Sequence, residues 1–216
     1  MKKYHTLIIL LGLAIALAAI GLFVRFIQYQ PLLPSEKKIK AYQEQIKQMQ
    51  IPVYADDPII GDKKAGITII AFEDFACQAC KFQFSLLEQI QKQYPQRIKI
   101  IWKGLTVTKF PHSTELANKY AYCANQQEKF NEFYPLAFTN SDKLTEDNLQ
   151  LIAEQIKLNK DDLSSCLTNA ATADYLTKTE QLGLLLHIQQ VPTFFLESKQ
   201  IKVPASAEDW RLILGL

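Results

Sequence analysis

Two of the four cysteines, Cys77 and Cys80, lie three residues apart in the stretch FEDFACQACKF, directly after an apolar run. Such a pair could bind a metal, form a structural disulfide, remain as two core thiols or act as a redox centre. A zinc site needs two further ligands at suitable spacing. The other candidate ligands form no spaced pair: they are Cys123, Cys166, His5, His112 and His187. We therefore expect no metal site, and a redox centre is favoured over inert thiols.

The residues around the cysteine pair predict a strand–helix–strand unit. The β-branched run from Ala65 to Phe72 is typical of a strand buried on both faces. A helix is expected from Cys77 to about Tyr94, with Phe82, Leu86, Leu87 and Ile90 as its apolar side. A second strand is expected from Arg97 to Trp102. Elements of these lengths predict a βαβ unit with parallel strands.

The position of the pair at the start of this helix predicts a different role for each thiol. The spacing i, i+3 puts both sulfurs on one face of the helix. The free N–H groups and the dipole at the helix N-terminus favour the thiolate of Cys77, which is the attacking species in disulfide exchange. Cys80 lies one turn further along and is expected to be the less exposed, resolving thiol.

The remainder of the globular part predicts an α/β domain with an inserted helical block. Helical patterns run from about residue 113 to residue 187. The stretch VPTFFLESKQIKV then predicts two strands joined by a short polar turn, and SAEDWRLILGL predicts a terminal helix.

The N-terminal region predicts a membrane anchor. From Tyr4 to Val24 there are 21 residues without a charged side chain, and a helix of this length spans a bilayer core. A cleaved signal peptide is the alternative, but the apolar run continues to Val24, so an uncleaved anchor is favoured. We expect a cytoplasmic tip and anchor at 1–27, with residues 4–26 in the membrane, a stalk or linker at 28–55 and one domain at 56–216. The balance of Lys and Arg on the two sides does not decide the orientation.

The stalk region predicts an amphipathic helix capped by Ser35. Its apolar positions recur every three or four residues, at Ile39, Tyr42, Ile46 and Met49. It could pack on the domain or on a partner, or be a solvated spacer. The net charge of +2, from 24 basic and 22 acidic residues, leaves no broad basic surface for nucleic acid, so we expect no nucleic-acid partner.

The run DDPIIGDKKAGITIIAFEDFACQAC, residues 56–80, resembles the entry segment of DsbA-like thiol-disulfide oxidoreductases of the thioredoxin fold. That family also carries a Pro-Thr pair on a strand opposite the redox motif, and QQVPTFFL supplies it here. YCANQQEKFNEFYPLAF and LSSCL resemble the inserted helices of the family. The resemblance covers residues 56–216 and implies a thioredoxin fold with its helical insertion between the first βαβ unit and the C-terminal hairpin and helix.

The resemblance also implies roles for individual residues. Cys77 would be the nucleophile and Cys80 the resolving thiol. The substrate would contact Val191, a cis Pro192, Thr193, Gln78 and Ala79. Cys123 and Cys166 lie where some members have a second, structural disulfide, and separate buried thiols are the alternative. No cofactor is implied.

The sequence departs from the family at two points near the cysteine pair. Many members have a buried carboxylate six residues before the first cysteine, where this chain has Ala71. Glu73 shares the face of Ala71 by strand alternation, and it could act as the proton acceptor through water or be a solvated residue at the strand end. No cation lies between the cysteines, and Glu73 and Asp74 are nearby, so we expect Cys77 to be less acidic than in the strongest oxidants.

The leading hypothesis is a membrane-anchored bacterial oxidase whose domain lies outside the cytoplasm. It would donate its Cys77–Cys80 disulfide to cysteine-containing exported proteins and be reoxidised by a membrane partner. One alternative is a reductase or isomerase that receives electrons from a membrane donor. The other is a redox-inactive module that binds peptides or acts as a chaperone.

Overall fold

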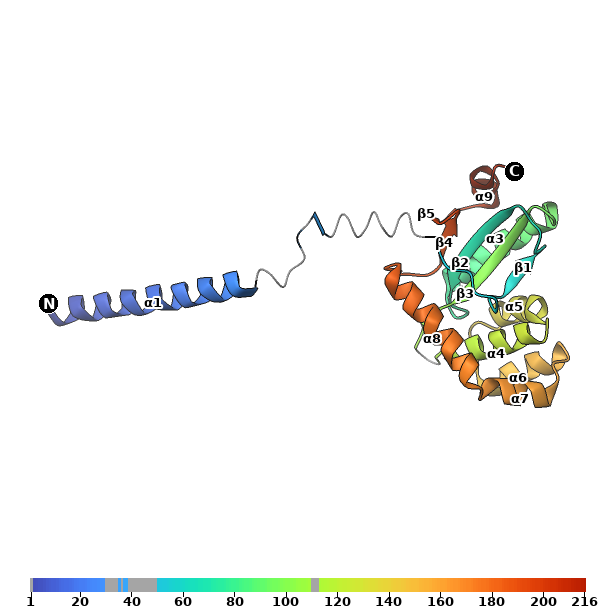
Figure 1. Cartoon of the computed structure of the whole chain (residues 1–216), viewed down its shortest axis with the longest axis horizontal. Coiled ribbons are helices and arrows are strands. Elements are labelled where there is room, and N and C mark those ends of the chain that lie inside the picture. The colour runs from blue at the N-terminus through green and yellow to red at the C-terminus, as the bar shows by residue number, and fades with distance from the viewer. Residues whose placement is uncertain (1, 30–34, 36, 39–49, 110–112) are drawn as a thin grey trace. The chain divides into compact units, whose positions relative to one another are not determined.

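The computed structural model describes all residues except 1, 30–34, 36, 39–49 and 110–112 (Figure 1). The chain divides into two compact units, Met1–Gln48 and Met49–Leu216. The predicted stalk helix lies mostly outside the described residues, because Ile39, Tyr42, Ile46 and Met49 all belong to the undescribed ranges.

The first unit contains one long helix, α1, from Lys2 to Tyr29. Its segment Ile8–Gln28 has 21 residues and a mean hydropathy of 2.5, so it is long and apolar enough to cross a membrane. The side chains of this segment are all exposed within the unit. A signal sequence near an N-terminus would have the same length and composition.

The second unit is built on a five-stranded mixed sheet in the order β1-β3-β2-β4-β5. The strands are β1 Ile59–Gly61, β2 Ile67–Glu73, β3 Ile98–Gly104, β4 Thr193–Leu196 and β5 Lys199–Ile201. β2 and β3 run parallel and are joined by helix α3, Gln78–Gln93, which confirms the predicted βαβ unit. The other neighbouring strands pair antiparallel. The sequence did not indicate β1, and β2 and β3 extend past their predicted ends to Glu73 and Gly104.

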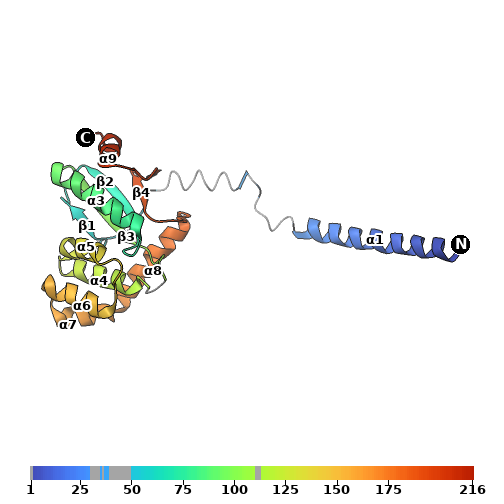
Figure 2. The same ribbon diagram turned by 180° about the vertical axis from the view of Figure 1, so that it is seen from behind.

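Helices lie on the faces of this sheet and beyond one end of it. α3 lies against one face, and α4 to α7 gather beyond one end, from which α8 runs back towards the sheet (Figures 1 and 2). The inserted helices are α4 Glu115–Gln126, α5 Phe130–Thr139, α6 Glu146–Gln155, α7 Lys160–Leu167 and α8 Ala170–Leu185, and α9 Ala207–Leu214 follows the hairpin. The predicted thioredoxin fold with a helical insertion is confirmed.

The core between the sheet and α3 corrects one expectation. Leu86, Leu87 and Ile90 of α3 are buried as predicted, but Phe82 is 52% exposed. Gln83 takes the buried position instead, where its side chain donates to the Pro204 carbonyl and accepts from the Trp210 indole N–H. This pairing satisfies a buried amide and ties α3 to α9.

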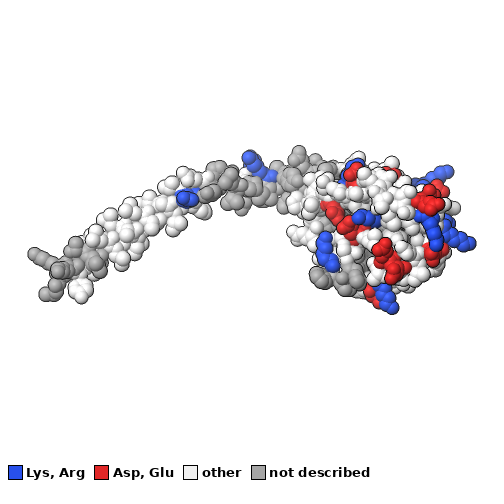
Figure 3. Space-filling view, turned by 90° about the horizontal axis from the view of Figure 1, so that it is seen from below, with Lys and Arg blue, Asp and Glu red and all other residues white. Residues whose placement is uncertain are grey.

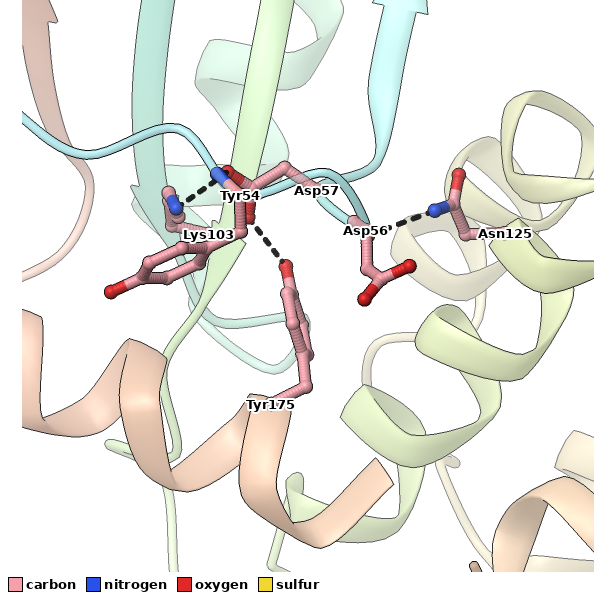
Figure 4. A network of polar contacts seen from close by, with 6 residues as sticks. All are labelled: Tyr54, Asp56, Asp57, Lys103, Asn125 and Tyr175. Atoms are coloured by element: carbon pink, nitrogen blue, oxygen red, sulfur yellow. Dashed lines mark hydrogen bonds and ion pairs between the residues drawn. The ribbon is translucent and has the colours of Figure 1, made fainter. Parts of the chain in front are cut away.

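The other face of the sheet contains a buried ion pair (Figure 4). The Lys103 ammonium lies 2.6 Å from Asp57 Oδ2, and neither side chain is exposed. The Tyr54 backbone N–H and the Tyr175 hydroxyl also donate to the Asp57 carboxylate, and the Tyr54 ring lies 3.9 Å from the ammonium. Burial raises the pKa of Asp57 and lowers the pKa of Lys103, while the ion pair opposes both shifts. The network joins the segment before β1, the end of β3 and α8.

Cys123 of α4 and Cys166 of α7 are joined by a disulfide, with 5.8 Å between their Cα atoms. Closing a loop between residues 43 apart stabilises a fold by roughly 2 to 4 kcal/mol.

Acidic and basic side chains are interspersed on the face of the unit shown in Figure 3.

Candidate active site

Cys77 lies at the N-cap of α3, between the end of β2 and the first turn of the helix. Its sulfur accepts a hydrogen bond from the backbone N–H of Cys80 at 3.2 Å. Cys77 is partly exposed, whereas Cys80 is completely buried. One sulfur is therefore available to a partner thiol and the other is protected from it.

The side chain of Asp74 organises the turn that presents Cys77. Its Oδ1 accepts from the Ala76 N–H at 2.8 Å, and its backbone carbonyl accepts from the Cys77 N–H at 3.0 Å. Its Oδ2 accepts from Val107 N–H, Thr108 N–H and the Thr114 hydroxyl. Asp74 thereby fixes the loop after β3 against the cysteine motif. Sequence reasoning treated this residue only as a nearby charge, because the partners of its Oδ2 lie 33 to 40 residues away.

The pKa of Cys77 is lowered from its ordinary value to about 7. The largest cause is a hydrogen bond from the Cys80 side chain, and the backbone N–H groups of Cys80 and Ala79 act in the same direction. Partial burial and the negative charge of Asp74 oppose the shift. About half of the Cys77 thiols are therefore ionised at neutral pH, which is less than in oxidants whose thiol pKa is about 3.5.

The pKa of Cys80 is raised well above its ordinary value. Burial is the main cause, followed by its hydrogen bond to Cys77 and the negative charge of Glu73. Cys80 therefore keeps its proton when Cys77 has lost its own, so the two thiols have separate roles.

Glu73, at the end of β2, is completely buried. The alternative that Glu73 is a solvated residue is wrong, because Tyr134 of α5 lies against this end of the strand. The Tyr134 hydroxyl donates to Glu73 Oε2 at 2.6 Å, and Oε1 has no hydrogen-bond partner among the described residues. Burial raises the pKa of Glu73 to about 8, with a smaller contribution from the Cys77 charge, while the Tyr134 hydrogen bond lowers it. The Glu73 carboxyl group is therefore mostly protonated at neutral pH.

The loop before β4 passes directly beside Cys77. The Val191–Pro192 peptide bond is cis, and the Cys77 thiol donates to the Val191 carbonyl oxygen at 3.5 Å. Thr193 begins β4, and its hydroxyl donates to the Gln190 carbonyl. This contact brings together residues 114 positions apart in the chain.

The residues between the cysteines, Gln78 and Ala79, are exposed beside this site. Outside the undescribed ranges, no group of three or more His, Cys, Asp or Glu side chains lies close enough together to hold a metal ion.

The family model described as Thioredoxin matches residues 54–215. The chain belongs to the thioredoxin family. Among curated relatives, the Na(+)/H(+) antiporter NhaA 3 of Salinispora tropica is 24% identical over 166 residues, 76% of this chain and 25% of the antiporter. The disulfide bond formation protein D of Bacillus subtilis is 24% identical over 161 residues, 70% of this chain and 72% of that protein. The chain thus spans about a quarter of the length of the antiporters that it matches.

Solved structures confirm the fold. The thiol-disulfide exchange protein alpha-DsbA2 of Wolbachia pipientis superposes with a TM-score of 0.65 and 17% identity, covering 83% of this chain and 93% of that protein. The thioredoxin fold that the resemblance to DsbA-like proteins implied is therefore confirmed.

The thiol environment predicts how fast Cys77 reacts with an alkylating reagent. In the reduced protein, the iodoacetamide rate should rise with pH through a midpoint near 7, because only the thiolate attacks. Cys80→Ala removes the largest cause of the lowered Cys77 pKa. The midpoint of the Cys77 alkylation rate should therefore rise by about one pH unit in this variant. A wild-type midpoint near that of a free thiol, about 8.5, would contradict the assignment.

Proposed function

We propose that this thioredoxin-family protein is a thiol-disulfide oxidoreductase that donates the Cys77–Cys80 disulfide to cysteine-containing proteins. The observation that carries the proposal is the asymmetry of the pair. Cys77 is accessible, has a pKa of about 7 and lies at a helix N-terminus, whereas Cys80 is buried and holds its proton. An accessible sulfur with a low thiol pKa is both a good target and a good leaving group in disulfide exchange.

The reaction proceeds by two exchanges. A substrate thiolate attacks Cys77 Sγ, which forms a mixed disulfide and breaks the Cys77–Cys80 bond, so that the electron pair goes to Cys80. A second substrate thiolate attacks the substrate sulfur of the mixed disulfide and releases Cys77 as a thiolate. The substrate loses two electrons, and the cysteine pair gains them.

Glu73 is proposed as the proton carrier for Cys80. When the disulfide opens, the buried Cys80 thiolate takes up a proton, and the mostly protonated Glu73 carboxyl group can supply it. In the reverse step, Glu73 can accept the proton as Cys80 attacks. A carboxyl group whose pKa is about 8 can act in both directions near neutral pH.

Substrate and partner contacts are proposed from the surface beside Cys77. The Val191 carbonyl, Pro192, Thr193, Gln78 and Ala79 would contact the substrate chain. The disulfide bond formation protein D, a relative of which this chain covers 72%, supports cysteine-containing proteins as substrates, and we propose that these are exported proteins. The reduced pair must then be reoxidised by a partner protein, for which a membrane oxidase is proposed.

The domain is proposed to be anchored to a membrane by residues 4–26 and to lie outside the cytoplasm. The apolar segment of α1 supports the anchor, since an exposed segment of 21 residues with a mean hydropathy of 2.5 is stable only when it leaves water. The Cys123–Cys166 disulfide supports the compartment, because structural disulfides persist in oxidising environments. Domain limits of 1–27, 28–55 and 56–216 are part of this proposal.

A dithiol assay with cysteine variants tests the oxidase activity. The oxidised full chain should convert a peptide with two thiols to its disulfide, with one peptide oxidised by each protein chain. Cys77→Ser should abolish this oxidation. Cys80→Ser should instead accumulate mixed disulfides through Cys77 in the native cell. Peptide binding that is unaffected by Cys77→Ser, without any dithiol oxidation, would indicate a binding module. A chain that is mostly reduced in its native cell would indicate electron flow in the opposite direction.

Labelling of intact cells tests the membrane placement. The protein should remain in membranes after alkaline extraction. A membrane-impermeant thiol reagent, added after an impermeant reductant, should label the wild type but not Cys77→Ser. Three results would contradict the placement: the protein is released by alkaline extraction, the protein isolated from cells has lost the apolar segment by cleavage, or Cys77 is labelled only after the cells are lysed.

A further inference from the structure

Tyr134 belongs to the helical insertion, yet its hydroxyl group contacts the end of the strand that carries the cysteine motif. The hydroxyl donates to Glu73 Oε2 at 2.6 Å, across 61 positions of sequence. Both side chains are buried, Glu73 completely and Tyr134 to within 3%. The contact joins α5 to the carboxyl group that lies four residues before Cys77 in the chain.

The Tyr134 ring is held in place by other aromatic rings. Its centroid lies 5.0 Å from that of Phe138, 5.3 Å from that of Phe84 and 6.1 Å from that of Phe75, all with the rings edge to face. Phe75 is part of the cysteine motif and Phe84 is part of α3. Edge-to-face packing from several directions leaves the ring little freedom to rotate. The hydroxyl group is thus directed at Glu73 from a fixed position.

The two oxygens of the Glu73 carboxyl group have different surroundings. Oε2 accepts the Tyr134 hydrogen bond, whereas Oε1 has no partner among the described residues. Glu73 shares a sheet face with Ala71, and Ala71 and Cys80 belong to the same buried core cluster. The Glu73 charge acts on Cys80 and on Tyr134 alike, as expected for close neighbours. Among the described residues, Oε1 is therefore the carboxyl oxygen without a hydrogen-bond partner, and it can take up a proton.

We propose that Tyr134 is a positioning residue, which orients the Glu73 carboxyl group and stabilises its ionised form so that Glu73 can take the proton of Cys80. The proposal rests on the oxidoreductase function above. The step is the attack of Cys80 on Cys77 in a mixed disulfide. The Cys80 S–H bond breaks and its proton goes to Glu73, the Cys77–Cys80 bond forms, and the bound thiol leaves with its electron pair. The helical insertion thus contributes to the chemistry of the cysteine pair.

Few other charged groups act on Glu73. Among the described residues, the titratable groups that act on it are Tyr134 from α5 and the two cysteines at the start of α3. Lys103 of β3 pairs with Phe72 and lies on the opposite sheet face. The Asp74 carboxylate is turned to the loop after β3.

The test measures the pH dependence of one intramolecular exchange. The reduced full chain is reacted with Ellman's reagent, and stopped flow follows the release of the second thionitrobenzoate as Cys80 attacks Cys77. Removing the Tyr134 hydrogen bond disfavours the carboxylate, so Tyr134→Phe should move the pH midpoint of this rate upward by about one to two units. The rate at neutral pH should fall roughly tenfold. Glu73→Gln should remove this pH dependence, and adding Tyr134→Phe to it should change nothing further.

Tyr175→Phe is the matched control. It removes the same oxygen from another buried tyrosine, whose hydroxyl donates to the carboxylate of Asp57 on the far side of the sheet. Its pH midpoint should equal that of the wild type.

The proposal is overturned if Tyr134→Phe leaves the midpoint unchanged, if Tyr175→Phe shifts it equally, or if Glu73→Gln keeps the wild-type profile. The last outcome decides the question even where Tyr134→Phe does not fold. A failure of the proposed function is distinct, since it would appear in the dithiol assay, where the oxidised full chain would leave the peptide thiols unoxidised.

Discussion

The carboxyl group of Glu73 is buried completely between the end of β2, the start of α3 and helix α5. A buried carboxyl group without full hydration is stable only if it holds a proton or receives hydrogen bonds. Glu73 does both in part, because Tyr134 satisfies one oxygen and burial keeps the pKa near 8. The fold of the insertion and the chemistry of the cysteines therefore meet at this one group.

The cysteine pair depends on the same arrangement from its other side. Asp74 receives hydrogen bonds from the turn before Cys77 and from the loop after β3, while Phe75 packs 4.9 Å from Trp102 in the core. These contacts fix the start of α3, where the Cys77 sulfur accepts the Cys80 N–H. These two neighbouring carboxyl groups thus differ. Both oxygens of Asp74 accept hydrogen bonds and shape the turn, whereas Glu73 Oε1 has no partner in the part of the chain that the structure describes.

Sequence reasoning could predict the features that depend on local pattern. The spacing of Cys77 and Cys80, the apolar run before them and the polar turn of the terminal hairpin each imply an element and a place in it. The sequence did not predict which of Phe82 and Gln83 is buried. Both lie near the sheet-facing side of α3, and only the contact of Gln83 with Trp210 of α9 decides which one is buried.

Contacts between distant residues could not be predicted in this way. Strand alternation indicates the face on which Glu73 lies, but not that α5 covers the strand end. Tyr134 is one of nine tyrosines and carries no local signal for its contact with Glu73. A lysine at the end of a strand, such as Lys103, is expected to be solvated. Its burial is possible because it pairs with Asp57, 46 residues earlier in the chain.

The central claim, that a buried carboxyl group near the cysteines holds and releases a proton close to neutral pH, is tested most directly by infrared difference spectroscopy. Spectra of the reduced full chain, taken from about pH 5 to pH 10, should contain a protonated carboxyl band that disappears with a midpoint near 8. Subtracting the spectra of Glu73→Gln separates this band from that of Asp57, which is also buried. A difference band that is absent, or that titrates near the ordinary glutamate value of about 4.3, would contradict the account.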